Sequence, residues 1–131
     1  MNILLDTQTL IWALEDETLI SKNARDAIIA ADRVLVSPIS FYEIAIKLAI
    51  GKNAGVSKPI HKLISAAIQS GYVWLPLSAL HISAYTQLPF FDRHRDPFDR
   101  MLLAIASADN LSIISSDHNF PLYNNIVRTI W

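Results

Sequence analysis

Two carboxylates stand directly behind apolar runs that have the composition of buried strands. Asp6 follows the run 2–5, and Asp117 comes just after the run 111–115. The carboxyl ends of neighbouring parallel strands meet at one edge of a sheet, where ligand sites of α/β proteins form. If these two strands are neighbours, we expect the two side chains to face one crevice.

Two further acids lie on helices that are expected near the same edge. Glu43 is one turn into a helix predicted for 38–50, which follows a strand and so begins at that edge. Asp99 is in the first turn of a helix predicted for 96–108. It reaches the crevice only if the loop 89–98 carries the chain back across the top of the sheet.

Taken singly, each acid also has an ordinary structural explanation. These explanations are a turn or helix N-cap for Asp6 and Asp117, an ion pair with Lys47 for Glu43, and, for Asp99, a first-turn acid in a helix with Asp96 as N-cap. Taken together, four carboxylates at one edge repel, which raises their pKa values unless a cation neutralises them. Oxygen ligands without histidine or cysteine favour Mg²⁺ or Mn²⁺ over zinc. Such a cluster suits metal-assisted phosphodiester hydrolysis, in which the cation generates hydroxide and stabilises the leaving oxygen.

The elements that must position these acids alternate along the whole chain. The expected strands are 2–5, 33–37, 72–77 and 111–115, with a possible fifth at 126–131. The expected helices are 7–14, 21–31 with Ser21 as N-cap, 38–50, 59–69, 78–87 and 96–108. This alternation predicts an α/β fold with a mostly parallel central sheet flanked by helices on both faces.

The composition limits the class of protein. The chain has 131 residues, a net charge of −1 and no cysteine, so we expect one domain without disulfides or a global basic field. No apolar run approaches the length of a membrane helix, and the amino terminus lacks signal-peptide features, so we expect a cytoplasmic protein. Hydrophobic residues make up 52% of the chain, and the mean hydropathy is +0.30. This surplus favours a protein partner or a homodimer.

Four segments, taken in order and spacing, resemble the signatures of a known family. They are LLDTQTLIWAL, SFYEIAIK, HRDPFDRMLLAIA and IISSDHNF. The chain resembles PIN-domain ribonucleases, and more closely the VapC-type toxins of prokaryotic toxin–antitoxin systems. The resemblance implies a single PIN domain over 1–131 with a PIN-like fold and Mg²⁺- or Mn²⁺-dependent endoribonuclease activity that leaves 5′-phosphate and 3′-hydroxyl ends. It also implies a homodimer and a cognate VapB-type antitoxin.

The resemblance assigns site residues at matching positions. Asp6, Glu43, Asp99 and Asp117 take the catalytic, metal-binding acidic positions. Thr7 and Ser115 match small hydroxyl positions, and we interpret both as groups that orient the carboxylates or a metal-bound water. Asp96 is interpreted first as the helix N-cap, with outer-sphere metal binding as the alternative. His94 is interpreted as a hydrogen-bonding loop residue rather than a general base.

Substrate and partner contacts are predicted with alternatives. Arg93, Arg95 and Arg100 could contact the RNA phosphate backbone, or pair with the neighbouring acids and hold the loop in shape. The helix 38–50 has too many apolar residues for one buried stripe, so a second face is expected to meet a partner. Apolar residues of 60–68 (Ile60, Leu63, Ile64 and Ile68) are expected to provide a groove for an antitoxin helix.

Two rival functions remain at this point. A phosphatase with an aspartyl nucleophile also places an acid after the first strand, but its second aspartate, two residues later, is Gln8 in this chain. The other rival is a non-catalytic PIN-like module that binds RNA or a protein. Intact acids count against the second rival, and RNA cleavage would distinguish it from the enzyme.

Overall fold

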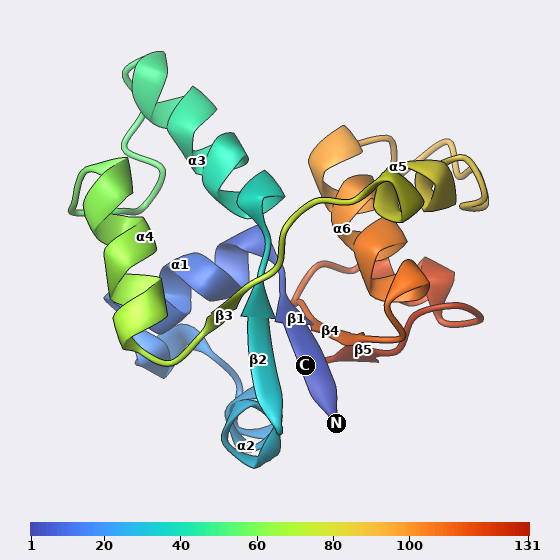
Figure 1. Cartoon of the computed structure of the whole chain (residues 1–131), viewed down its shortest axis with the longest axis horizontal. Coiled ribbons are helices and arrows are strands. Elements are labelled where there is room, and N and C mark those ends of the chain that lie inside the picture. Colours follow the sequence, from blue (N-terminus) through green and yellow to red (C-terminus); the bar gives the residue numbers. More distant parts are fainter.

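The computed structural model describes all 131 residues (Figure 1). The strands are β1 (Asn2–Leu5), β2 (Arg33–Val36), β3 (Val73–Trp74), β4 (Ser112–Ile114) and β5 (Thr129–Ile130). The helices are α1 (Thr7–Glu15), α2 (Lys22–Ala30), α3 (Pro38–Ala49), α4 (Ile60–Gln69), α5 (Ala79–Tyr85) and α6 (Pro97–Ala108), with short 3-10 helices η1 (Glu17–Leu19) and η2 (Phe120–Tyr123). Every predicted element is present in the predicted order.

The five strands form one parallel sheet in the order β3-β2-β1-β4-β5. The central strand β1 pairs with β2 on one side and with β4 on the other, so the first and fourth strands are neighbours, as the crevice requires. The strand predicted for 72–77 is shorter than expected. Its ladder ends where Leu75 N donates to Val36 O, because β2 itself ends at Val36 and the chain turns there into α3.

Helices cover both faces of the sheet. Ile3 and Leu5 of β1 face a core that includes residues of α1, α2, α3 and α4, whereas Leu4 faces a second core built with α6 and η2. Side chains alternate along a strand, so adjacent residues serve opposite layers. In Figure 1 α1 and α4 lie to the left of β1 and β2, with α5 and α6 to the right. The predicted fold class is therefore confirmed.

The α3 helix has an apolar face that the chain does not cover. Tyr42 and Ile50 are 60% and 66% exposed, and Ile46 between them is also exposed. These three residues recur every four positions and so lie along one side of the helix. The prediction that α3 has more apolar residues than one buried stripe can use is therefore confirmed.

The groove predicted on residues 60–68 is mostly absent. Leu63 is buried in the core, and Ile60 and Ile64 pack against the same core. Only Ile68 is exposed. The apolar side of α4 packs against α1 and the sheet, so that part of the prediction is wrong.

No helix combines the length and apolar character that a membrane span requires.

Candidate metal centre

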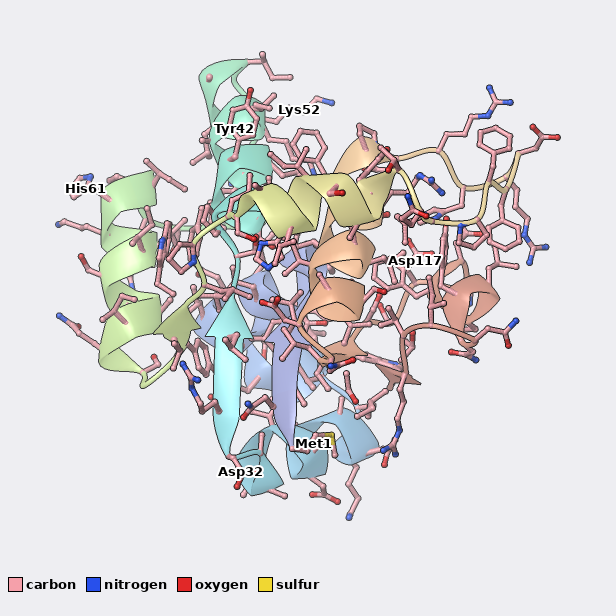
Figure 2. All side chains as sticks on the ribbon, turned by 45° about the vertical axis from the view of Figure 1, so that its right-hand side comes forward. Met1, Asp32, Tyr42, Lys52, His61 and Asp117 are labelled. Atoms are coloured by element: carbon pink, nitrogen blue, oxygen red, sulfur yellow. The ribbon has the colours of Figure 1, made fainter.

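The four predicted acids line one cleft at the carboxyl edge of the sheet. Its volume is about 450 Å³, and its walls include Asp6, Glu43, Asp99 and Asp117. Asp6 follows β1, Asp117 follows β4, and Glu43 and Asp99 come from α3 and α6. In Figure 2, Met1 and Asp32 lie together at the bottom, and Asp117 lies well above them. The N-terminal ammonium pairs with Asp32, so that end is the amino end of β1.

Asp6 is anchored within the fold and has an unfavourable environment for its charge. Its side chain is nearly buried (the residue is 5% exposed), and its Oδ1 accepts a hydrogen bond from Thr9 N at 2.8 Å as the N-cap of α1. Burial raises the pKa of Asp6, the nearby Asp117 raises it further, and hydrogen bonds from Ser115 and Thr9 partly offset the rise. The residue therefore serves as a helix cap and as a carboxylate of the cleft.

Asp99 also has a strongly perturbed carboxyl group. Burial, and then the charges of Asp96, Asp117, Asp6 and Glu43, raise its pKa to about 8. At neutral pH this side chain holds its proton unless a positive charge enters the cleft. A group of carboxylates that repel one another strongly enough to keep one of them protonated is suited to binding a cation.

Glu43 supplies an independent observation that fits a cation. Its Oε2 lies 3.5 Å from Lys47 Nζ, the ion pair that the sequence allowed. Its Oε1 is buried and has no hydrogen-bond partner. A buried carboxylate oxygen without a donor costs free energy, and a divalent cation bound by the four carboxylates would satisfy it. The oxygen donor set and the orphaned atom both fit Mg²⁺ or Mn²⁺.

The predicted hydroxyl residues lie beside the acids. The fully buried Ser115 accepts a hydrogen bond from Asp117 N through Oγ at 3.1 Å, and its interaction with Asp6 lowers the pKa of that carboxyl. Ser115 thereby joins two of the acids. Thr7 lines the cleft, and its Oγ1 donates to Ser40 Oγ at 3.1 Å.

Asp96 is outside the cleft wall and caps α6. Its Oδ1 accepts hydrogen bonds from Phe98 N at 2.8 Å and from Asp99 N at 3.2 Å, and Pro97 occupies the first helical position. This confirms the N-cap interpretation. Its charge still acts on the site, because it raises the pKa of Asp99.

The three predicted arginines differ in exposure and in hydrogen-bond partners. Arg93 and Arg95 are exposed on the loop before α6, and Arg95 Nη2 donates to Asp92 Oδ1 at 2.8 Å. Arg100 is only 7% exposed and donates to Tyr123 Oη at 2.8 Å and to Pro89 O at 3.0 Å. The prediction of a phosphate contact is wrong for Arg100, because its guanidinium group is used inside the fold. The alternative fits in part: Arg100 holds the loop through Pro89 O, but its side-chain partner is Tyr123 and not a neighbouring acid.

The cleft contains further polar residues that the sequence analysis did not assign to the site. Its walls also include Gln8, Lys47, Ser116 and His118. Gln8 and His118 are close neighbours in sequence of Asp6 and Asp117, and this proximity could have identified them. Lys47 was considered as an ion-pair partner of Glu43, because the sequence does not show that α3 turns it toward the cleft.

His94 is a hydrogen-bonding residue, as predicted, and it also reaches the site. Its Nε2 lies 3.2 Å from Asp99 Oδ2, and ligand atoms of His94, Asp99 and Asp117 lie within 4.8 Å of one another. Burial lowers the pKa of this histidine, partly offset by the charge of Asp117.

Comparisons with known proteins identify the family and the fold. A profile of the PIN domain family matches residues 3–125. The chain belongs to the PIN domain family. Its fold is similar to that of a chain in VapBC2 from Rickettsia felis bound to a promoter DNA fragment, with a TM-score of 0.69, 16% identity and complete coverage of both chains. Among curated proteins, none matches this sequence.

Two further solved structures have a similar fold. VapBC-1 from nontypeable Haemophilus influenzae has a TM-score of 0.66 at 17% identity, with 98% of this chain and 96% of that chain covered. VapBC-5 from Mycobacterium tuberculosis has a TM-score of 0.58 at 17% identity, with 98% and 94% covered. At this identity the likeness concerns the fold, so the role of the acids rests on this chain's own cleft.

Proposed function

We propose that this PIN domain is a metal-dependent endoribonuclease and the toxin of a type II toxin–antitoxin pair. One observation carries the proposal: four carboxylates from separate elements line one cleft, and one of their buried oxygens has no donor. A purely structural cluster of acids would be expected to pair its buried oxygens within the fold. The nuclease assignment of the PIN family and the cleft chemistry point to the same reaction class.

In this proposal Asp6, Glu43, Asp99 and Asp117 hold one or two Mg²⁺ or Mn²⁺ ions. When bound, the cation supplies charge stabilisation for phosphodiester hydrolysis and lowers the pKa of water. The protein's own contribution is to keep the four carboxylates within reach of one another and to release the proton of Asp99 on binding. Ser115 holds the backbone of Asp117 in place, which limits the movement of that carboxylate.

RNA is the proposed substrate, and the rim of the cleft offers contacts to its backbone. Lys47 lines the cleft, and Arg93 and Arg95 are exposed on the loop that leads into α6. Positive side chains beside a metal site suit phosphate oxygens, which fix position without reading sequence. We therefore assign Arg93 and Arg95, and not Arg100, to substrate binding.

A VapB-type antitoxin and a second copy of the chain are the proposed partners. The similar structures from Rickettsia felis and Haemophilus influenzae are named as VapBC assemblies, which supports an antitoxin here. The exposed stripe of Tyr42, Ile46 and Ile50 on α3 supports a protein partner, and we propose a homodimer through it. Sedimentation at micromolar concentration tests this, and a monomer would contradict the homodimer. The proposed compartment is the cytoplasm, where RNA and antitoxin are available.

The test is cleavage of total cellular RNA by the purified full chain, with and without Mg²⁺ or Mn²⁺. The variants are Asp6→Asn and Asp99→Asn, and the matched control is Asp26→Asn. Asp26 is exposed on α2 and pairs with Lys22, so it undergoes the same chemical change outside the cleft. We expect metal-dependent fragments with 5′-phosphate ends from wild type and the control, and a loss of more than about 100-fold in both cleft variants.

The outcome separates the enzyme from the binding module. If folded wild type binds Mn²⁺ yet cuts neither total RNA nor a panel of structured RNAs, the nuclease proposal fails and the non-catalytic module takes its place. If the cleft variants cut as well as wild type, the activity belongs to a contaminant or another site. Thermal stabilisation by Mn²⁺ alone does not distinguish the two functions, because both bind the ion.

A further inference from the structure

The buried histidine next to the cleft has a hydrogen-bond partner on each ring nitrogen. Nδ1 of His94 lies 2.9 Å from the hydroxyl of Tyr123, and Nε2 lies 3.2 Å from Asp99 Oδ2. The residue is 3% exposed, with ring centroids of Tyr123 and Phe120 at 5.5 Å and 5.9 Å. Aromatic packing therefore fixes the imidazole between the core and an acid of the cleft.

Arg100 determines which group donates and which accepts in these hydrogen bonds. Its Nη1 donates to the Tyr123 hydroxyl at 2.8 Å, while its guanidinium lies 5.3 Å from the ring centre of Tyr85. A guanidinium group has donors only, so the Tyr123 oxygen must accept. Tyr123 is completely buried, and Nδ1 of His94 lies within hydrogen-bond distance of its hydroxyl, where it can accept the hydroxyl proton.

The tautomer of the histidine follows from this order. If Tyr123 donates to Nδ1, the neutral imidazole carries its own proton on Nε2 and donates it to Asp99 Oδ2. The opposite tautomer would direct two donors, Arg100 and Nδ1–H, at one hydroxyl and leave the hydroxyl's proton buried without an acceptor. The hydrogen-bond inventory is complete for the first tautomer and incomplete for the second.

We propose that Arg100, Tyr123 and His94 form a buried hydrogen-bonded chain that positions Asp99 for cation binding, with His94 as a positioning residue and not a metal ligand. The inference deepens the proposed function and rests on it for the identity of the cleft. Asp99 Oδ2 is committed to His94, and Oδ1 is left for the cation. The four carboxylates of the cleft then supply oxygen ligands without His94, which suits Mg²⁺ or Mn²⁺ rather than zinc.

Distance alone does not separate this arrangement from direct ligation. The ligand atoms of His94, Asp99 and Asp117 are close enough together to hold one ion. Ligation would require a lone pair on Nε2, whereas the proposed chain places a proton there. The position of that proton is therefore the quantity to measure.

The first experiment is nitrogen-15 NMR of the imidazole groups in the full chain, metal-free and with Mg²⁺. The chain has four histidines, and the signal lost in His94→Gln identifies the relevant ring. We expect an unprotonated Nδ1 and a protonated Nε2 under both conditions. An Nδ1–H tautomer in the metal-free chain, or loss of the Nε2 proton when Mg²⁺ binds, would overturn the proposal.

Paired variants test the positioning role by calorimetric Mn²⁺ affinity, together with thermal unfolding. The amide nitrogen of Gln can reach the place of Nε2, whereas Asn reaches only that of Nδ1. We expect His94→Gln to stay within about 3-fold of wild type and His94→Asn to weaken binding by about 10-fold or more. Equal losses of Mn²⁺ affinity in the two folded variants would contradict the proposed hydrogen-bonded chain.

A second pair covers the case in which His94→Asn does not fold. Tyr123→Phe removes the hydroxyl that orients His94, and we expect about 10-fold weaker Mn²⁺ binding with both tautomers populated. Tyr85→Phe removes a hydroxyl from another neighbour of Arg100 and is expected to stay within about 3-fold. Wild-type affinity and a single tautomer in Tyr123→Phe would overturn the proposal.

These measurements use no RNA, so they fail separately from the nuclease assignment. If the tautomer and the variant pattern are as expected while wild type cuts no RNA, the positioning chain stands and the nuclease proposal falls. If wild type cuts RNA while Mg²⁺ removes the Nε2 proton, the nuclease proposal stands and His94 is a ligand.

Discussion

The raised pKa of Asp99 predicts how the stability of the metal-free protein depends on pH. The pKa rises from 3.8 to about 8 in the folded chain, so between these values the folded state binds more protons than the unfolded state. The free energy of unfolding therefore falls as pH rises from about 4 to about 8 and levels off above that. Asp99→Asn removes this titration, so its stability should change less than that of wild type over the same window.

The size of the effect follows from the shift. A difference of about 4 pKa units corresponds to an upper limit of about 6 kcal/mol. The Asp99 side chain is 20% exposed, and water in the open cleft screens the repulsion between the acids. We expect about 2–3 kcal/mol between pH 5 and pH 8.5. The pKa of Asp6 is also raised, so a slope of the same sign should remain in Asp99→Asn.

The assay is urea unfolding followed by circular dichroism at several pH values, with a chelator present. The control is Asp26→Asn, which should keep the wild-type slope. Saturating Mn²⁺ should remove most of the wild-type decline, because the cation stabilises the ionised carboxylates. Parallel stability curves for wild type and Asp99→Asn would refute the reasoning, since Asp99 would then titrate as an ordinary carboxyl group.

Three further predictions concern binding and stability. Below about pH 8, apparent Mn²⁺ affinity measured by calorimetry should fall by up to about tenfold per pH unit, because Asp99 must lose its proton; a pH-independent affinity would contradict this. Asp96→Ala should cost about 1 kcal/mol in urea unfolding, because α6 loses its N-cap, whereas the exposed Asp92→Ala should cost less than about 0.5 kcal/mol. Leu103→Ala should cost about 2–5 kcal/mol, since Leu103 is fully buried in the core against the sheet; a loss below 1 kcal/mol would contradict that packing.

The meeting of Asp6 and Asp117 was predictable, because it depends on local pattern and on one topological rule. Each acid follows a short apolar run, and the runs form the adjacent parallel strands β1 and β4. The carboxyl ends of parallel strands meet at one edge whatever the sequence between them. Asp99 was less certain, since its place depended on the path of a long irregular loop.

The interior role of Arg100 was harder to predict from the residue type, although the spacing contained a signal. Arg100, Leu103 and Ala104 lie three and four positions apart and are all buried, so they share one face of α6. The arginines beside the predicted metal site suggested phosphate binding and a role in holding the loop equally, and the periodicity of Arg100 was not used to choose between them. Its acceptor Tyr123 is in η2, a short segment between β4 and β5 whose place no local pattern fixes.

The structural and functional explanations of the acids are compatible, because each carboxyl group has two oxygens. Thr9 N holds Oδ1 of Asp6, and Asn119 N holds Oδ1 of Asp117. In the same way, Lys47 pairs with Oε2 of Glu43 and His94 with Oδ2 of Asp99. Every acid of the cleft thus has one oxygen tied to the fold, and for Glu43 the other is buried without a donor. Caps and ion pairs that look merely structural in the sequence therefore restrict the carboxylates before a cation arrives, which reduces the conformational entropy lost on binding.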